Sequence, residues 1–240
     1  AMPNAIFKVE MLSEDKNTYL DGEGGVFMEK SYTKIYTTGA TVPLKIRPGH
    51  FATNHAHINY YIDVTTLKAR TKEAEDVAQA LVGMYLYDTV IDTIVCMEGT
   101  EVIGAFLAEE LAKGGFLSTN AHKSIYVISP EFNNNSQIIF RDNLIPMIRD
   151  KHVMILMASV TTGRTLNKAV ESIQYYGGIL QGASAIFSAM DSLDGVPIKS
   201  VFGKKDLPDY TYSDYRDCPL CKAGKKIDAL VNTFGYSPMG

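Results

Sequence analysis

The residues best suited to chemistry stand at positions 161–165, in the sequence Thr-Thr-Gly-Arg-Thr. Three hydroxyls donate hydrogen bonds without bulk, an arginine adds positive charge, and a glycine lets a ligand approach the backbone closely. An apolar run of strand type precedes these residues and a helical pattern follows them. Unpaired N–H groups at a helix start favour an anion. We therefore predict a phosphate-binding loop at Thr161, Thr162, Gly163, Arg164 and Thr165. A plain strand-to-helix turn that the threonines cap remains open as an alternative.

A second strand-to-helix turn stands at 98–101, in the sequence Glu-Gly-Thr-Glu. Its carboxylates, Glu98 and Glu101, repel an anion unless a cation bridges them, and Mg²⁺ prefers carboxylate oxygens. Lys204 and Lys205 are candidates to bring positive charge to this place from elsewhere in the chain. We therefore expect Mg²⁺ as the cofactor of this turn if the protein is active.

The cysteines offer a separate, weaker signal. Cys218 and Cys221 have the Cys-x-x-Cys spacing in which two thiolates share one Zn²⁺. The second half of a zinc site is not evident from the sequence, because Cys96 falls on a predicted core strand. A redox pair lacks its usual βαβ context. The interpretations that stay open are zinc binding and a simple turn with two partly buried thiols.

Aromatic residues and histidines cluster in the segment 46–67. His50, His55 and His57 have no pair of carboxylates at ligand spacing beside them. A metal site stays open as an alternative, but we expect them to contact an anionic or aromatic ligand. Tyr60 and Tyr61 point to opposite sides of a strand, so one is predicted to lie in the core and the other to stack on a flat ring.

Composition limits the class of protein. The chain has 240 residues, enough for one α/β domain with a full core, and its net charge of -4 argues against a dedicated nucleic-acid partner. No apolar run reaches the length of a membrane span, and no signal-peptide pattern is present. We expect a cytoplasmic protein with no membrane partner. Three cysteines do not indicate a disulfide scaffold.

The elements that must position these residues alternate between strand and helix. Strands are predicted at 60–64, 92–99, 123–130, 152–159 and 179–190, and helices at 71–90, 101–115 and 164–178. Residues 131–146 are predicted to form a polar loop. The alternation predicts an α/β fold with a central, mainly parallel sheet flanked by helices. Ligands bind at the carboxyl ends of such strands, so both turns should share that edge.

Three segments are expected: a β-rich N-terminal hood at 2–67, a core at 68–203 and a Cys-x-x-Cys extension at 204–240. The extension is rich in tyrosine and carries an amphipathic piece. We expect it to pack on the domain or on a partner subunit. Tyr175 and Tyr176 are predicted to serve packing or a dimer interface.

Taken in order, these motifs resemble the type I phosphoribosyltransferases. The apolar strand followed by "TTGRT" resembles the 5-phosphate loop of that family. Glu98, Gly99, Thr100 and Glu101 stand where the family keeps its diphosphate loop. The segment 46–67 resembles the base-binding segment of orotate phosphoribosyltransferases, with Arg47, Gly49, Tyr60 and Tyr61 at the corresponding places. The resemblance covers residues 44–195 and implies a type I phosphoribosyltransferase fold.

The resemblance also implies an activity. A homodimeric enzyme of this kind transfers 5-phosphoribosyl from phosphoribosyl diphosphate to a nitrogenous base with Mg²⁺, in nucleotide synthesis or salvage. Two features of this chain depart from the family pattern. Met157 and Ala158 replace the acidic pair that holds the ribose hydroxyls, and residues 129–140 lack the family's basic groups and carry Glu131 instead. The alternative is a regulator that binds a nucleotide or sugar phosphate without transfer.

Overall fold

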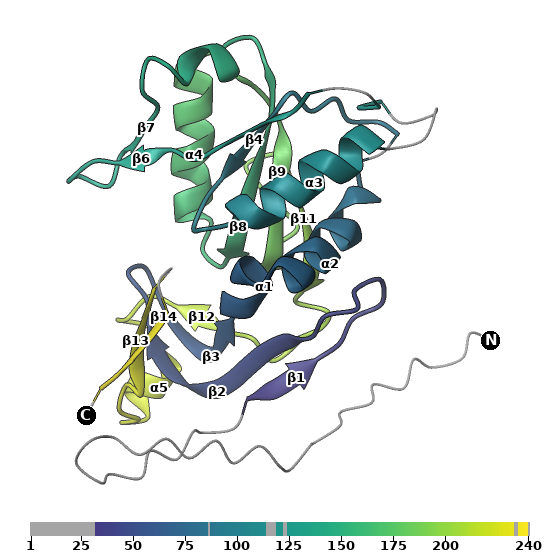
Figure 1. The fold of residues 1–240 in the computed structure, drawn as a ribbon. Coiled ribbons are helices and arrows are strands. Elements are labelled where there is room, and N and C mark those ends of the chain that lie inside the picture. Colours follow the sequence, from purple (N-terminus) through teal and green to yellow (C-terminus); the bar gives the residue numbers. More distant parts are fainter. Residues whose placement is uncertain (1–31, 86, 114–118, 122–123, 233–234, 240) are drawn as a thin grey trace, which may run out of the picture.

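The computed structural model describes residues 32–85, 87–113, 119–121, 124–232 and 235–239. These residues build two six-stranded sheets that lie one above the other, joined through the short helix α1 (Thr65–Ala69), and one small two-stranded sheet (Figure 1). The first part of the predicted β-rich hood, residues 2–31, lies outside the described residues. The part that is described contains β1 (Thr33–Ile35).

The core sheet confirms the predicted α/β architecture. Its strands run in the order β10-β11-β9-β8-β4-β5, and every neighbouring pair except β10 with β11 is parallel. The strands are β4 (Thr93–Cys96), β5 (Tyr126–Ile128), β8 (His152–Val160), β9 (Ile179–Ser188), β10 (Ser192–Leu193) and β11 (Val196–Gly203). Because β4 and β8 are adjacent and parallel, the turns that follow them share the carboxyl edge of the sheet, as predicted.

Helices cover both faces of this sheet. Side chains of α2 (Thr71–Val82) and α3 (Glu101–Lys113) pack in one apolar cluster with Met154 and Leu156 of β8. Side chains of α4 (Arg164–Tyr175) pack in a second cluster with the alternate residues of the same strand. A strand buried on both faces needs an unbroken apolar run, which explains the sequence of β8.

Several elements differ from the predictions or are additional to them. Helix α2 ends at Val82 rather than at residue 90, because Gly83 is a poor helix former. The segment after β9 forms the hairpin β10–β11, whose turn residues Asp194 and Gly195 have φ of 48° and 84°. A two-residue turn with positive φ at both positions is typical of hairpins with an Asp-Gly pair. The predicted polar loop 131–146 contains the hairpin β6 (Glu131–Phe132) with β7 (Ile138–Ile139) and the 3₁₀ turn η1 (Ile145–Met147).

The second sheet forms the hood and combines both ends of the described chain. Strand β2 (Leu44–Ala52) pairs with β1, β3 (His57–Asp63) and β13 (Ala229–Asn232). Strand β12 (Tyr212–Ser213) adds to β3, and β14 (Gly235–Pro238) adds to β13. The short helix α5 (Pro219–Lys222) lies between β12 and β13 in the chain. The tail therefore packs on the domain, as expected. The division into three segments stays a prediction.

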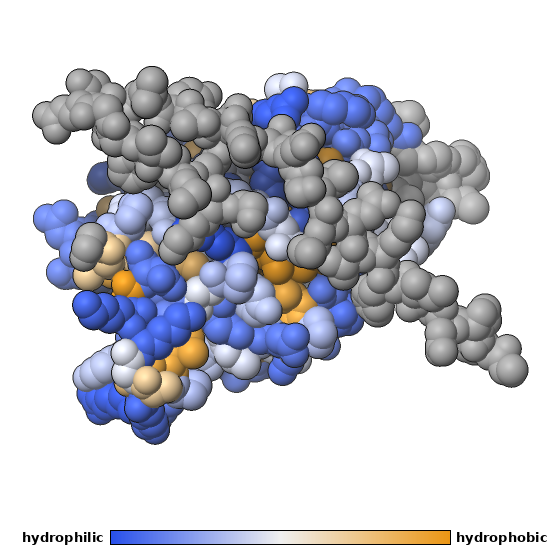
Figure 2. All heavy atoms as spheres, turned by 90° about the horizontal axis from the view of Figure 1, so that it is seen from below, coloured by the Kyte–Doolittle hydropathy of each residue, from blue (hydrophilic) through white to orange (hydrophobic). Residues whose placement is uncertain are grey.

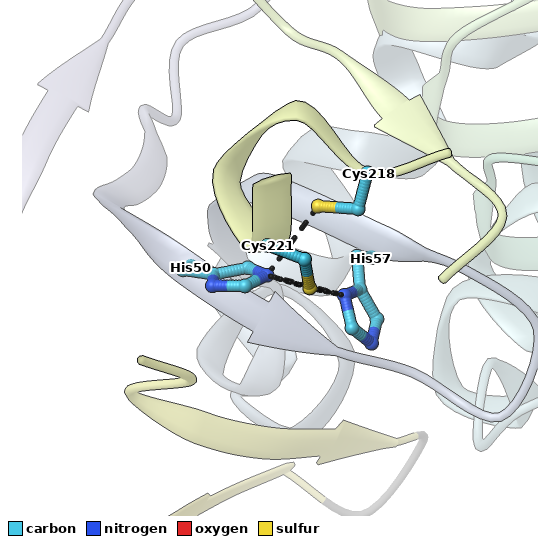
Figure 3. Close-up of side chains that lie close together, drawn as sticks. All are labelled: His50, His57, Cys218 and Cys221. Carbon is cyan, nitrogen blue, oxygen red and sulfur yellow. Dashed lines mark hydrogen bonds between the residues drawn. The ribbon is translucent and has the colours of Figure 1, made fainter. Parts of the chain in front are cut away.

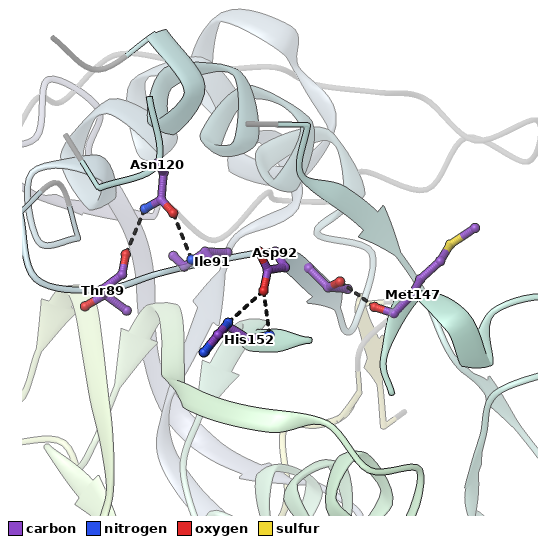
Figure 4. Close-up of polar contacts among 7 residues, drawn as sticks. Thr89, Ile91, Asp92, Asn120, Met147 and His152 are labelled. Carbon is purple, nitrogen blue, oxygen red and sulfur yellow. Dashed lines mark hydrogen bonds and ion pairs between the residues drawn. The ribbon is translucent and has the colours of Figure 1, made fainter. Parts of the chain in front are cut away.

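At the amino edge of the core sheet, opposite the two turns, polar contacts connect the start of β4 to neighbouring segments (Figure 4). Asp92 accepts hydrogen bonds from the backbone N–H of His152 at 2.9 Å, and its carboxylate lies 2.7 Å from the His152 ring. Asn120 bridges the backbone of Thr89 and Ile91 at 2.8 Å on each side. Thr93 donates to the Met147 carbonyl. These contacts fix the start of β4 against β8 and so position the turns at the other edge.

The outer surface of the hood is mainly hydrophilic, and its apolar residues form small separate clusters where the described residues are visible (Figure 2). Within the described parts of the chain, none of the helices is long and apolar enough to cross a membrane.

Candidate functional site: a cavity between the core and the hood

A cavity of about 220 Å³ lies between the carboxyl edge of the core sheet and the hood. The core contributes the ends of β8 and β4 and the start of α4. The hood contributes the turn between β2 and β3 and parts of β13 and β14. The lining residues with polar or aromatic side chains include Thr53, Asn54, His55, Tyr61, Lys68, Glu98, Ser159, Thr161, Thr162, Arg164, Thr165, Tyr210 and Asn232.

The predicted phosphate loop lines this cavity with all five of its residues. Strand β8 ends at Val160 and α4 begins at Arg164, so the loop delivers the start of a three-turn helix to the cavity. Gly163 has φ of 74°, which disfavours any residue with a Cβ. A Cβ at this position would also approach the tip of Leu193 at 2.8 Å. The Thr161 hydroxyl hydrogen-bonds the Tyr210 hydroxyl at 2.9 Å, which fixes the loop to the C-terminal segment.

Positive charge gathers around the loop. Burial lowers the pKa of His55, and the nearby positive charges of Arg164 and Lys168 lower it further. The turn that carries His55 is held by Thr53, whose side-chain oxygen accepts hydrogen bonds from the backbone N–H groups of His55 at 3.1 Å and Ala56 at 2.9 Å. The hood thus places a histidine opposite the arginine of the loop, an arrangement that suits an anion.

The turn after β4 brings one acid and one base into the same cavity. A Glu98 carboxylate oxygen accepts hydrogen bonds from the backbone N–H groups of Ala158 at 3.2 Å and Ser159 at 3.3 Å. Lys68, on α1, donates to the Glu98 carbonyl oxygen at 2.7 Å. Burial raises the pKa of the Glu98 carboxyl, and the hydrogen bonds and Lys68 offset part of that rise. Burial also lowers the pKa of Lys68.

Glu98 lies beside Met157 and Ala158, the two residues at the positions where the resembled family has its acidic pair. Met157 and Ala158 line the cavity and are 1% and 4% exposed. Because β4 and β8 are adjacent, the carboxylate of Glu98 reaches the backbone of Ala158 across the sheet edge. The neighbouring turn therefore supplies a carboxylate at a place where β8 itself offers none. The contact between Glu98 and Ala158 joins residues 60 positions apart, so no local sequence pattern predicts it.

Three of the four residues predicted for the diphosphate loop are absent from the cavity lining. Thr100 is fully buried and donates to the backbone carbonyls of Met97 at 2.9 Å and Leu156 at 3.0 Å. Glu101 accepts a hydrogen bond from the Ser129 hydroxyl at 2.6 Å. Gly99 has φ of 80° and lies near the Lys68 amine. Of this set, Glu98 lines the cavity, and the role of the turn stays a prediction.

The predicted base-binding residues divide in a similar way. Tyr61 is buried and lines the cavity, while Tyr60 packs, half-buried, against the core. Arg47 lies over the ring of Tyr236, 5.0 Å from its centroid, and does not appear in the lining. The Phe51 ring lies close to Gly49. A Cβ at position 49 would lie 2.5 Å from the Phe51 ring, so this position needs glycine. Binding of a base by these residues stays a prediction.

The segment that corresponds to the family's basic loop lies along α4 instead. Ser172 of α4 donates to the carbonyl of Ile138, and Glu131 pairs with Arg141 at 2.6 Å. Among the described residues, the cavity lining includes none from 129–140, and neither Lys204 nor Lys205. The cations at the cavity are Lys68 and Arg164. The sequence gives no local signal for Lys68 or for Tyr210, because each reaches the cavity from a distant part of the chain.

A second group of residues lies on the hood, outside the cavity (Figure 3). His50 from β2, His57 from β3, and Cys218 and Cys221 at α5 place their side-chain nitrogen and sulfur atoms within 4.8 Å of one another. The expectation that His50 and His57 contact an anionic or aromatic ligand is wrong, because they face the two cysteines. His55 points to the cavity side and fits that expectation.

No protein-family model matches the sequence, and no curated protein matches it. Solved structures of phosphoribosyltransferases do align with it. The orotate phosphoribosyltransferase of Mycobacterium tuberculosis in complex with phosphoribosyl diphosphate is 14% identical, with a TM-score of 0.45, over 61% of this chain and 82% of that chain. A phosphoribosyltransferase from Corynebacterium diphtheriae is 14% identical, with a TM-score of 0.49, over 68% of this chain and 90% of that chain.

The adenine phosphoribosyltransferase of Leishmania donovani is 12% identical, with a TM-score of 0.44, over 66% of this chain and 77% of that chain. These proteins and this chain are similar in their α/β architecture. At such identities the similarity does not indicate which substrate this chain binds.

Proposed function

We propose that the chain binds a 5-phosphorylated ribose compound in the cavity and transfers phosphoribosyl from phosphoribosyl diphosphate to a nitrogenous base. The observation that supports this most is that one cavity is lined both by the phosphate loop and by Lys68. The loop suits the 5-phosphate, because helix-start N–H groups, threonine hydroxyls and Arg164 surround it. Lys68, beside the turn after β4, suits the diphosphate.

Glu98 is proposed to hydrogen-bond the ribose hydroxyls in place of the missing acidic pair. One of its carboxylate oxygens accepts the two backbone N–H bonds, and the other is left for a ligand. Mg²⁺ is usually held by one or two carboxylates together with substrate phosphates. Within the described parts of the chain, Glu98 is the one carboxylate in the lining. A Mg²⁺ ion would therefore be held by Glu98 and by the diphosphate itself.

In the transfer, a nitrogen of the base forms a bond to C1 of the ribose while the bond from C1 to the diphosphate breaks, with inversion at that carbon. Negative charge gathers on the leaving diphosphate, and Lys68 is the group placed to stabilise it. Loss of one such stabilising group costs about 10²–10³ in rate. Tyr61 offers a flat, buried ring for the base on the hood side.

A second candidate function is binding of a nucleotide or sugar phosphate without transfer. Met157 and Ala158 favour it, because neither side chain accepts a hydrogen bond from a ribose hydroxyl. The phosphate loop is common to both candidates, whereas Lys68 and Glu98 matter for transfer. A homodimer, a cytoplasmic location and a role in nucleotide synthesis or salvage belong to the first proposal through the resemblance described above.

The test is an assay of diphosphate release from phosphoribosyl diphosphate with Mg²⁺ and a panel of purine and pyrimidine bases. The first candidate predicts base-dependent release, and a loss of about 10²–10³ in rate for Lys68→Ala. Lys72→Ala is the matched control, because Lys72 is an exposed lysine paired with Glu75 and Asp76 on α2. Saturable binding without release assigns the second candidate. Absence of both release and binding overturns both.

A further inference from the structure

Four of the six distances between the ligand atoms of the side chains on the hood are close to those of a tetrahedral metal site. His50 Nε2 lies 3.1 Å from His57 Nδ1, 3.5 Å from Cys218 Sγ and 3.6 Å from Cys221 Sγ. Cys221 Sγ lies 3.2 Å from His57 Nδ1. Zn–N bonds of ~2.05 Å and Zn–S bonds of ~2.3 Å at tetrahedral angles give about 3.3 Å between two nitrogens and about 3.6 Å between nitrogen and sulfur. The four distances fit this geometry to within a few tenths of an ångström.

The surroundings of His50 leave the correct nitrogen free for a metal. Its Nδ1 hydrogen-bonds the backbone carbonyl of Lys225 at 2.8 Å, so the proton of a neutral ring stays on Nδ1 and Nε2 keeps its lone pair. A hydrogen bond of this kind orients ligating histidines in metal sites. Asp228 holds the backbone in place by accepting from the His50 N–H at 2.7 Å. His50 is fully buried, so this arrangement is protected from solvent.

The cysteine half has the backbone of a metal-binding turn. Cys218 stands directly before the one-turn helix α5 and Cys221 lies within it. The backbone N–H of Lys222 donates to the Cys218 carbonyl at 3.1 Å, and that of Gly224 donates to the Cys221 carbonyl at 2.9 Å, so the turn holds the two cysteines together. Gly224 closes the turn with φ of 72°. Both thiols are free, with Cys218 buried and Cys221 exposed.

We propose that His50, His57, Cys218 and Cys221 bind one Zn²⁺ ion in a closed structural site. Nitrogen and sulfur ligands in tetrahedral geometry select zinc over oxygen-preferring cations. Four protein ligands leave no open position for substrate or water, so the ion serves structure rather than catalysis. The site is separate from the cavity and from the proposed transfer reaction.

The ion fastens the C-terminal segment to the hairpin that closes over the cavity. His50 and His57 flank the turn 53–56, three of whose residues line the cavity. Cys218 and Cys221 lie between β12, which pairs with β3, and β13, which pairs with β2. One ion therefore joins the two strands of the hairpin to the segment that extends the same sheet on both sides.

The test is the zinc content and zinc affinity of the full chain, measured by elemental analysis and by competition with a chromophoric chelator under reducing conditions. We expect about one zinc ion per chain, and a cobalt-substituted protein with the visible absorption of a tetrahedral thiolate site. Cys221→Ser should weaken zinc binding by more than about 100-fold, since even residues that only orient a ligand contribute about 10–100-fold.

His55→Ala is the matched control, because this histidine lies in the same hairpin but outside the group of four. It should keep the zinc affinity of the unaltered chain. The proposal is overturned if the reduced, unaltered chain takes up no zinc, if Cys221→Ser keeps full affinity, or if His55→Ala loses it. A thiol count that finds Cys218 and Cys221 joined in a disulfide in the purified, zinc-free protein overturns it as well. None of these measurements needs a substrate, so they do not depend on the proposed function.

Discussion

The phosphate loop and the group of two histidines and two cysteines are built in opposite ways. The loop is five consecutive residues whose conformation follows from one strand, one glycine and one helix start. The four metal-ligand candidates come from two segments, with His50 and Cys218 168 positions apart. The loop holds backbone groups ready for a ligand. The group of four links distant segments and touches no substrate. Changes at the first should therefore alter binding, and changes at the second should alter stability.

Removal of zinc should have the largest effect on stability. Binding to the folded state alone stabilises by about 4.1 kcal/mol when free zinc is 1,000 times its dissociation constant. Urea unfolding under reducing conditions, with and without a strong chelator, measures the difference. Cys221→Ser should show a much smaller response to the chelator than the unaltered chain. If the unaltered chain unfolds at the same urea concentration with and without the chelator, the four residues do not stabilise the fold through zinc.

Gly163→Val should act on both stability and binding. Its φ of 74° costs a β-branched residue about 1–3 kcal/mol, and the new side chain would meet Leu193. We expect lower stability and no detectable binding of ribose 5-phosphate by calorimetry. Gly195→Val is the matched control, because Gly195 has φ of 84° with nothing within 4 Å of a new Cβ. It should lose similar stability and keep binding. Equal loss of binding in both variants would show that the loop at Gly163 has no specific role in binding ribose 5-phosphate.

Arg164→Ala should weaken binding and leave stability unchanged. A hydrogen bond to a charged group contributes about 1.5–3 kcal/mol, so affinity for ribose 5-phosphate should fall by about 10–100-fold. Arg164 is exposed, and its removal should change the free energy of unfolding by less than about 0.5 kcal/mol. Arg149→Ala, an exposed arginine before β8, should change neither quantity. An unchanged affinity in Arg164→Ala would place the anion elsewhere.

Glu98→Gln should have the smallest effect, a pH-dependent gain in stability. Burial raises the Glu98 pKa in the folded chain, so the folded state keeps this proton to higher pH than the unfolded chain. Stability is therefore lost as the pH rises from the ordinary carboxyl pKa of about 4.3 through the raised folded pKa, and it stays lost above that. Glutamine carries no charge and keeps an oxygen for the two N–H bonds.

The variant should thus melt at a higher temperature than the unaltered chain at neutral pH, and at the same temperature in acid, where Glu98 is protonated. Thermal melts across this pH range measure the difference. Glu109→Gln, on the exposed face of α3, should show no such crossover. A Glu98→Gln variant that is less stable at neutral pH would mean that the carboxylate is stabilised where it lies.

The sequence predicts what depends on neighbouring residues. The apolar run of β8, the glycine of the loop and the amphipathic pattern of α4 together place residues 161–165 at the carboxyl edge of a parallel sheet, and the structure confirms that position. Phosphate binding by these residues stays a prediction. Neighbouring residues do not predict contacts between distant segments. Glu98 reaches Ala158 across the sheet, Lys68 comes from α1, and Tyr210 comes from the C-terminal segment.

The histidines show the same limit more sharply. His50, His55 and His57 are close in sequence, yet the first and third face the cysteines while the second lines the cavity. His50 lies on β2, His57 begins β3 and His55 lies in the turn between them, so the three side chains have different surroundings. Only the pairing of β2 with β13 and of β3 with β12 brings the cysteines within reach.

The most direct test of the proposed function is calorimetric titration of the unaltered chain with ribose 5-phosphate and, in parallel, with ribose. The two ligands differ by the phosphate that the loop should bind. The phosphate loop predicts saturable binding of one ribose 5-phosphate per cavity, with inorganic phosphate as a competitor and no detectable binding of ribose at the same concentration. Equal binding of both sugars, or binding of neither, would contradict it.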